Sequence, residues 1–345
     1  MSKFSPRKSF PRLLDLPRSY FLGHHASGLA EMKSMLTQIH LIIECRDYRV
    51  PLTSRNPLFE QTLAGRERMV VYTKKDLGSL NRIKDFRREN IIRGWHKPQE
   101  TFFIDTQTKK DVGALLKFVK SYAEKKNSLL PLRVLVVGMP NVGKSSLLNS
   151  LRKSGMKKSK AAATGAQPGI TRKIATAVRI VGRDINKKLE GIYLVDTPGV
   201  FVPYVSDSES MLKLALVGSV KDTIISPVTL CDYLLFMLNQ QKGGELLYDK
   251  YSHPTNDIVE FLNQVAYKTG RLKKGEIPDL EATALWIIQK WRQGKLGTFL
   301  LDEVEECGLE KKMNEPSVIS LNQARKQAKI SRQEKHKLGS NPVVD

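Results

Sequence analysis

The sequence is poor in cysteine, in long apolar runs and in acidic residues. Its three cysteines, Cys45, Cys231 and Cys307, lie far apart, so they offer neither a disulfide framework nor metal-ligand spacing, and they fit a reducing compartment. No apolar run approaches the roughly 18 residues that a membrane-spanning helix needs. Lysine and arginine total 57 against 35 aspartate and glutamate, a net charge of +22. This excess is large for an ordinary metabolic enzyme and indicates a polyanionic partner.

Residues 1–20 form a basic N-terminal segment with one acidic residue, Asp15. Its basic residues stand among serine, phenylalanine and leucine: Lys3, Arg7, Lys8, Arg12 and Arg18. This composition is typical of a mitochondrial targeting segment, although Pro11 and Pro17 weaken any continuous amphipathic helix. The alternative is a basic arm that binds RNA, and one segment can serve both purposes.

Short apolar strands alternate with helical segments through residues 21–205. Strands are expected at 38–44, 68–72, 101–104, 132–137, 176–181 and 192–195, with helices at 81–93 and 112–126. This alternation predicts an α/β fold with a doubly wound, mainly parallel sheet. Residues 206–310 are expected to form a smaller, all-helical domain without further strands, with helices at 211–220, 228–238, 257–268 and 280–292. Residues 311–345 are predicted to be a solvated basic tail, helical only when bound.

The stretch Gly138-Met139-Pro140-Asn141-Val142-Gly143-Lys144-Ser145 joins the strand at 132–137 to a helix that begins with Ser146 and Leu147. A glycine-bearing loop between a buried strand and a helix can point several backbone N–H groups at one phosphate, and the helix dipole adds to the attraction. We expect Lys144 to reach the outer phosphates and the Ser145 hydroxyl to hold Mg²⁺. The pattern indicates a nucleoside triphosphate without selecting its base; a chance turn is the alternative.

A second motif, Asp196-Thr197-Pro198-Gly199, follows the strand at 192–195. A carboxylate at a strand end can hold Mg²⁺ through a water, and the Gly199 N–H can sense the γ-phosphate. In the same chain as the phosphate loop, this tetrapeptide indicates phosphoryl chemistry.

A third motif, Thr73-Lys74-Lys75-Asp76, follows the strand at 68–72. The Asp76 carboxylate can accept two hydrogen bonds from N1 and N2 of guanine, donors that adenine lacks in that arrangement. Lys74 is expected to lie along the base plane. The usual first residue of this motif is asparagine, so Thr73 leaves part of the guanine contact open. The alternative is a charged turn after a strand.

The base motif precedes the phosphate loop here, whereas most GTPases have the reverse order. With this order the chain resembles the circularly permuted GTPases of the YlqF/RbgA/MTG family, which assist ribosome assembly. The resemblance covers most of residues 20–300 and also rests on four further stretches: 21–24, 47–57, 168–171 and 294–297. With the basic leader it is most similar to the mitochondrial branch. It implies a GTP-hydrolysing factor that assists assembly of the large ribosomal subunit in the mitochondrial matrix.

The resemblance also implies roles for single residues. Thr171 matches the threonine expected to bind Mg²⁺ when GTP is present. Asp105 and Thr106 stand where the family has a serine and an alanine, which implies backbone contact with guanine. Asn141 matches the phosphate-loop asparagine that related GTPases use to hold K⁺, a cation that can supply the charge of an arginine finger.

Val200 stands where many GTPases place the glutamine that orients the attacking water, and the family shares this apolar replacement. We therefore expect slow intrinsic hydrolysis, at or below roughly 10⁻⁴–10⁻² per second, with acceleration by ribosomes. His24 is the candidate for orienting water, because imidazole can do so near neutral pH. A purely structural His24 is the alternative.

Basic residues also crowd the region around the phosphate loop. No acidic residue stands between Lys125 and Arg183, and four lysines follow the loop: Lys153, Lys157, Lys158 and Lys160. GTP needs one or two cations, so the surplus suggests that ribosomal RNA reaches this region, with a merely solvated loop as the alternative. A peripheral contact with the anionic inner membrane stays open.

Two other functions remain open at this stage. One is a non-enzymatic RNA-binding scaffold whose nucleotide site is structural. The other is a P-loop ATPase or kinase that acts on RNA, which the threonine at position 73 allows.

Overall fold

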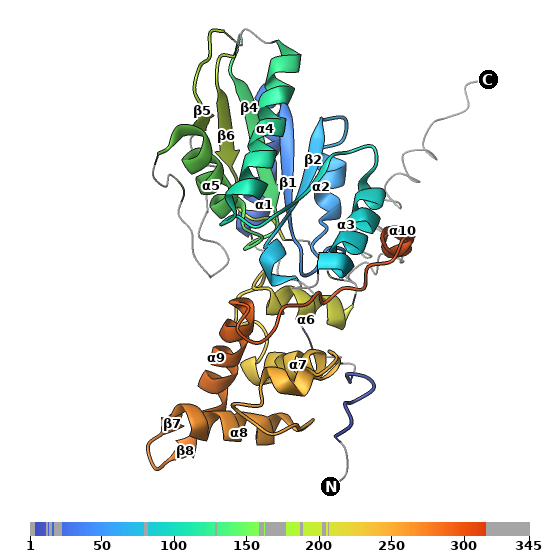
Figure 1. Ribbon diagram of the computed structural model, residues 1–345, viewed down its shortest axis with the longest axis vertical. Helices are drawn as coiled ribbons and strands as arrows, with labels where there is room; N and C mark the ends of the chain where they lie inside the picture. Colours follow the sequence, from blue (N-terminus) through green and yellow to red (C-terminus); the bar gives the residue numbers. More distant parts are fainter. Residues whose placement is uncertain are drawn as a thin grey trace, which may run out of the picture.

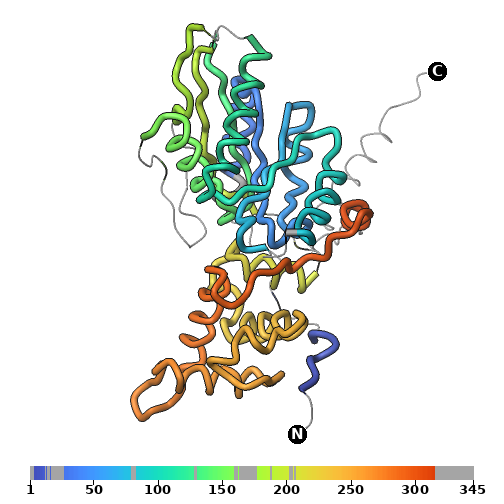
Figure 2. The backbone as a smooth tube through the Cα atoms, viewed as in Figure 1, coloured from blue at the N-terminus to red at the C-terminus, as the bar shows by residue number. Residues whose placement is uncertain are grey.

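The computed structural model describes residues 4–11, 13, 16, 23–78, 82–127, 130–158, 162, 177–186, 189–201, 205 and 207–314. A domain built on a β-sheet and a helical region lie at opposite ends of the molecule (Figure 1). Residues 4–11 lie beside the helical region, although the sheet domain follows them in the sequence (Figure 2).

The sheet has six strands in the order β3-β2-β1-β4-β6-β5. Its strands are β1 (Leu41–Asp47), β2 (Arg68–Thr73), β3 (Thr101–Ile104), β4 (Leu132–Gly138), β5 (Val178–Val181) and β6 (Ile192–Asp196). All neighbouring pairs are parallel except β5 with β6. The predicted α/β fold with a doubly wound, mainly parallel sheet is therefore confirmed, and β1 begins three residues later than expected.

Alternate residues of the strands face two different layers. Ile43 and Val136 point to the layer of α4 (Lys109–Lys126) and α5 (Lys144–Met156). Their neighbours Ile42 and Val137 pack instead with α1 (Gly23–Met35), the 3₁₀ turn η1 (Leu36–Gln38) and α2 (Pro57–Thr62). Farther along this second face, β2 and β3 pack on α3 (Arg82–His96). Strands buried on both faces explain the nearly continuous apolar runs in the sequence.

The helical region holds α6 (Ser208–Leu216), α7 (Pro227–Asn239), the 3₁₀ turn η3 (Gly244–Leu247), α8 (Ile258–Thr269) and α9 (Leu280–Arg292). Aspartates start three of them, because the carboxylates of Asp207, Asp257 and Asp279 accept hydrogen bonds from the first backbone N–H groups. The prediction of no further strands was wrong. A short antiparallel hairpin, β7 (Leu272–Lys273) with β8 (Ile277–Pro278), lies between α8 and α9.

After α9 the chain returns to the sheet domain. Leu301 donates a backbone hydrogen bond to Arg49 (2.8 Å), and the Asp302 carboxylate accepts from the Leu52 and Thr53 N–H groups. The last helix of the described residues, α10 (Gly308–Asn314), then lies next to α3 (Figure 1). Residues 301 and 302 therefore attach to the sheet domain at the loop 47–57.

The N-terminal segment is attached to the helical region by polar and aromatic contacts. The Arg7 guanidinium lies 2.6 Å from Asp232, and the Phe10 ring packs edge-to-face on Tyr233 with centroids 5.1 Å apart.

Within the described residues, none of the helices combines the length and apolar character that crossing a bilayer requires.

Candidate nucleotide site

The phosphate loop connects β4 to α5 at the carboxyl edge of the sheet, where ligands bind in open α/β sheets. Gly143 is the residue just before the helix, and its φ of +93° suits glycine. The loop wraps around the Lys144 ammonium, which donates to the carbonyls of Met139 (2.8 Å) and Gly138 (3.2 Å). Lys144 is 6% exposed, and burial lowers its pKa while the charge of Asp196 opposes that shift. A positive charge therefore lies at the centre of the loop.

Two predicted magnesium ligands touch. The Ser145 hydroxyl donates a 2.6 Å hydrogen bond to Asp196 Oδ2 at the end of β6. Among the described residues, the second Asp196 oxygen, Oδ1, has no hydrogen-bond partner although it is buried. Burial raises the Asp196 pKa, and Lys144 and the Ser145 bond oppose that rise. Oxygen ligands are what Mg²⁺ requires, so this pair fits the ion. Thr171, the third predicted ligand, lies outside the described residues.

The loop after Asp196 packs directly on the phosphate loop. A Cβ on Gly199 would lie 2.5 Å from the Pro140 Cα, so only glycine fits there. The next residue, Val200, donates its N–H to the Gly138 carbonyl (3.2 Å), while its side chain is fully buried among the apolar residues of α1 and α2. The side chain at position 200 therefore belongs to the core.

Helix α1 lies beside this loop. The position of a Cβ on Gly28 is 3.5 Å from the Pro198 side chain. His24 lies one turn earlier in the same helix, and its side chain is outside the described part of the structure. The helix that carries the candidate water-orienting residue thus contacts the Asp196–Gly199 motif.

The base motif is tied to the phosphate loop through its first two residues. The buried Thr73 hydroxyl donates to the Val142 carbonyl. The Lys74 ammonium donates to the Asn141 carbonyl (2.6 Å) and to Asp47 Oδ2 (2.8 Å). Burial lowers the Lys74 pKa to about 8, although the charge of Asp47 opposes that shift. Threonine in place of asparagine therefore still links the base motif to the phosphate loop.

Asp76 lies in the 3₁₀ turn η2 (Lys75–Leu77) and is exposed. Partial desolvation raises its pKa, and the nearby Asp105 carboxylate adds to the rise. The Asp105 side chain accepts from the Gln107 N–H and the Thr108 hydroxyl, so it stabilises its own turn. The Thr106 carbonyl accepts from Ser150 of α5 (2.8 Å). The chain segments expected to contact guanine therefore meet at one edge of the sheet, beside the phosphate loop.

Two further contributors to this site have no nucleotide role among the sequence predictions. Asp47 pairs with Arg49 (2.8 Å) as well as Lys74, and these two cations hold the Asp47 pKa well below its usual range despite its burial. Arg49 lies 5.0 Å from the Trp291 ring centroid of α9. The other contributor is the turn after α6, where Ser219 and Gly218 contact the phosphate loop. The contacts of Arg49 with Trp291 and of Gly218 and Ser219 with the phosphate loop leave no local sequence signal, since each joins residues more than seventy positions apart.

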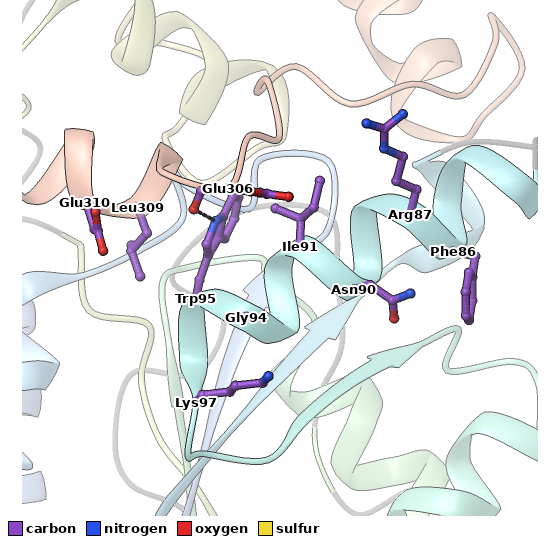
Figure 3. Close-up of a pocket in the computed structure, with 10 residues that line it drawn as sticks. All are labelled: Phe86, Arg87, Asn90, Ile91, Gly94, Trp95, Lys97, Glu306, Leu309 and Glu310. Carbon is purple, nitrogen blue, oxygen red and sulfur yellow. Dashed lines mark hydrogen bonds between the residues drawn. The ribbon is translucent and has the colours of Figure 1, made fainter.

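A cavity of about 850 Å³ lies elsewhere, between α3 and residues 306–310. Figure 3 shows Trp95 at its edge, with its indole N–H donating to the Glu306 carbonyl (3.0 Å). Phe86 and Arg87 line it from α3. None of its lining residues belongs to the three motifs, so it is separate from the nucleotide site.

The strand–loop–helix, the Ser145–Asp196 pair and a base motif that precedes both define a circularly permuted P-loop GTPase. The family model described as "50S ribosome-binding GTPase" matches residues 133–270. The chain belongs to the mitochondrial GTPase 1 family. It is 37% identical over 320 residues to "Mitochondrial GTPase 1" of Schizosaccharomyces pombe, covering 88% of this chain and 94% of that protein. It is 35% identical over 314 residues to "Mitochondrial ribosome-associated GTPase 1" of Bos taurus, covering 86% and 92%.

The fold is also found in a solved structure. GNP-bound YlqF from T. maritima aligns with a TM-score of 0.54 and 21% sequence identity, covering 80% of this chain and 97% of that one. At this identity the likeness concerns the fold alone. The relatives, at 35–37% identity over most of the chain, confirm the resemblance drawn from motif order.

Proposed function

We propose that the protein binds GTP with Mg²⁺, hydrolyses it slowly on its own, and assists assembly of the mitochondrial large ribosomal subunit. The observation that carries this proposal is the Ser145–Asp196 pair beside a base motif tied to the phosphate loop through Thr73. The printed names of the relatives, which mention the mitochondrion and the ribosome, support the cellular setting.

In this proposal the phosphates lie against the backbone N–H groups of the phosphate loop and the start of α5, and Lys144 contacts the outer phosphates. The residues of that cradle are Asn141, Val142, Gly143, Lys144, Ser145 and Ser146. Ser145, Asp196 and Thr171 hold Mg²⁺, which when bound neutralises charge on the phosphate oxygens. The Gly199 N–H reports whether the γ-phosphate is present.

Guanine is selected by Asp76, which accepts from the N1 and N2 donors. The Lys74 stem lies along the base, and its ammonium holds the Asn141 carbonyl. The backbone at Asp105 and Thr106 contacts the guanine base on its other side. Thr73 acts as a tether to the loop rather than as a contact to the base.

Water activation falls to groups other than Val200, because its side chain is buried. We assign the orientation of water to His24, which the packing of α1 on Pro198 supports. Asn141 is the candidate ligand for K⁺, which would add positive charge at the phosphates. The basic stretch from Lys125 to Arg183 and the tail 311–345 would bind ribosomal RNA in the matrix, with a peripheral contact to the anionic inner membrane as a further element.

Calorimetry with GTP and ATP tests the nucleotide site directly. We expect GTP to bind at least about a hundredfold more tightly, and Asp76→Asn to lose most of that preference because its amide clashes with the guanine donors. Asp249→Asn, an exposed change in the helical region, is the matched control and should leave the preference intact. Equal affinity for ATP and GTP in the unmodified protein would contradict the proposal.

Hydrolysis in K⁺ buffer, with and without purified mitochondrial large subunits, tests the cellular role. We expect the subunits to accelerate hydrolysis, and Ser145→Ala to abolish support for subunit assembly. A scaffold with a structural nucleotide site would keep assembly support in that variant. An unchanged hydrolysis rate with the subunits would overturn the coupled role.

A further inference from the structure

The turn between α6 and α7 reaches out of the helical region and contacts the phosphate loop. The Ser219 hydroxyl donates to the Pro140 carbonyl (3.1 Å), and the Asn141 side-chain amide donates to the Gly218 carbonyl (2.8 Å). Ser219 is 1% exposed, so water does not compete for its hydroxyl. The helical region therefore bonds to two consecutive residues of the loop, one through the backbone and one through the side chain.

The turn is held firmly within the helical region. Arg292 at the end of α9 donates to the carbonyls of Leu216 and Ala215 (2.8 Å each) at the end of α6, and the Ala215 carbonyl also accepts from the Gly218 N–H (2.9 Å). The same guanidinium pairs with Asp222 at 2.7 Å. A movement of α6 relative to α9 would therefore carry the turn with it.

The Pro140 carbonyl belongs to a series of three whose donors all come from outside the loop. Ser219 donates to Pro140, Lys74 to Asn141, and Thr73 to Val142. A peptide unit is planar and its C=O and N–H point in opposite directions, so holding a carbonyl also fixes the direction of the next N–H. These three donors therefore fix the N–H groups of residues 141–143, which the proposed function assigns to the phosphates.

We propose that Ser219 is a positioning residue for nucleotide binding and hydrolysis, through which the helical region sets the orientation of the Pro140–Asn141 peptide, while the neighbouring Gly218 carbonyl holds the Asn141 side-chain amide. This inference rests on the proposed function. Two of the three donors belong to the base motif, and Ser219 is the one that lies in the second domain. Binding energies are reciprocal, so a partner that moves the helical region changes nucleotide affinity, and the nucleotide changes affinity for that partner.

The test compares Ser219→Ala with Ser252→Ala. Ser252 is also 1% exposed and in the helical region, but its hydroxyl donates locally to the His253 carbonyl (2.8 Å). Each variant loses the single hydrogen bond that a buried serine hydroxyl donates, so similar decreases in the melting temperature are expected. Only Ser219→Ala should weaken GTP and GDP binding and slow hydrolysis at saturating GTP, by roughly tenfold, since it leaves the Pro140 peptide unrestrained.

The result that overturns the inference is a Ser219→Ala protein that binds and hydrolyses GTP like the unmodified protein. A matching loss of nucleotide affinity in Ser252→Ala would overturn it too, since the effect would then be general destabilisation. If Ser219→Ala does not fold, Ser219→Cys keeps the volume with a much weaker donor and gives the same comparison. Failure of the unmodified protein to bind GTP would instead refute the proposed function, so the two failures are distinguishable.

Discussion

The sheet domain and the helical region differ in the polar groups that they bury. The sheet domain buries charged side chains at and below the nucleotide site: Glu44, Arg46, Asp47, Arg49, Lys144 and Asp196. Between residues 207 and 298, all of which the structure describes, the buried polar side chains are neutral: Ser210, Ser219, Asn239, Ser252, Thr255 and Thr283. Burying a charge costs several kcal/mol unless it is paired, and the sheet domain pairs Glu44 with Arg46 (2.6 Å) and Asp47 with Arg49 (2.8 Å). The helical region instead has a core without buried charges, and it contacts the phosphate loop through Gly218 and Ser219.

The largest expected effect concerns the apolar core of the helical region. Phe261 of α8 is fully buried, and Phe261→Ala should lower the free energy of unfolding by about 3–5 kcal/mol. Val259→Ala is the control on the same helix, since Val259 is 49% exposed and should cost less than about 0.5 kcal/mol. Urea unfolding measures both. Equal losses would show that this helix is not packed as the structure describes.

The next effect should fall on activity rather than on stability. Asp196→Asn keeps the shape of the side chain and removes the charge that pairs with Mg²⁺, so hydrolysis of GTP should fall by about a hundredfold. The melting temperature should change little, because removing a buried charge offsets the loss of its contacts. Steady-state hydrolysis and calorimetry check the two parts. A rate within threefold of the unmodified protein would refute the assignment of Asp196 as a magnesium ligand.

A smaller effect should appear with pH in the sheet domain. Burial, reinforced by the charges of Arg46 and Arg68, lowers the His96 pKa to about 2, while an unfolded histidine titrates near 6.5. The folded protein therefore binds fewer protons than the unfolded chain in this window. The contribution of neutral His96 is complete above about pH 6.5 and decreases as the pH falls below it.

Urea unfolding at pH 7 and pH 5 measures this effect. Because His96→Gln removes the titrating group, the unmodified protein should lose about 1–2 kcal/mol more than that variant over this interval. The same pH dependence in both proteins would mean that His96 does not contribute.

The smallest effect concerns the N-terminal segment. Arg7 and Asp232 are partly exposed, at 25% and 18%, so their coupling energy should be about 0.5–1 kcal/mol. A double-mutant cycle with Arg7→Ala and Asp232→Ala measures it, and high salt should reduce it. Additive losses would show that the segment is held by Phe10 rather than by the ion pair.

Several features of the fold were predictable because they are local. The phosphate loop is recognisable because an apolar strand is followed by eight residues that contain two glycines, a lysine and a serine. The first strand was placed three residues too early, because its buried charges, Arg46 and Asp47, look like the start of a loop in the sequence. The hairpin at 272–278 was missed since its strands have two residues each, too few for a periodic pattern.

In the nucleotide site, too, local features were predictable and long-range contacts were not. The three motifs were found from residue types and spacing, and the structure brings the described parts of all three to one edge of the sheet. The assignments of these residues to nucleotide and metal remain predictions. The ion pair between Arg7 and Asp232 was not predicted, because the basic composition of residues 1–20 also suits a targeting segment.

By itself, the sequence determined the class of protein, the order of its motifs and the alternation of strands and helices, since each depends on neighbours within a few positions. Only the tertiary structure decided which donors hold the phosphate loop and that one of them, Ser219, comes from the helical region. The physical reason is that a hydrogen bond between residues 140 and 219 depends on the packing of α6, α9 and the sheet together, which no local pattern records.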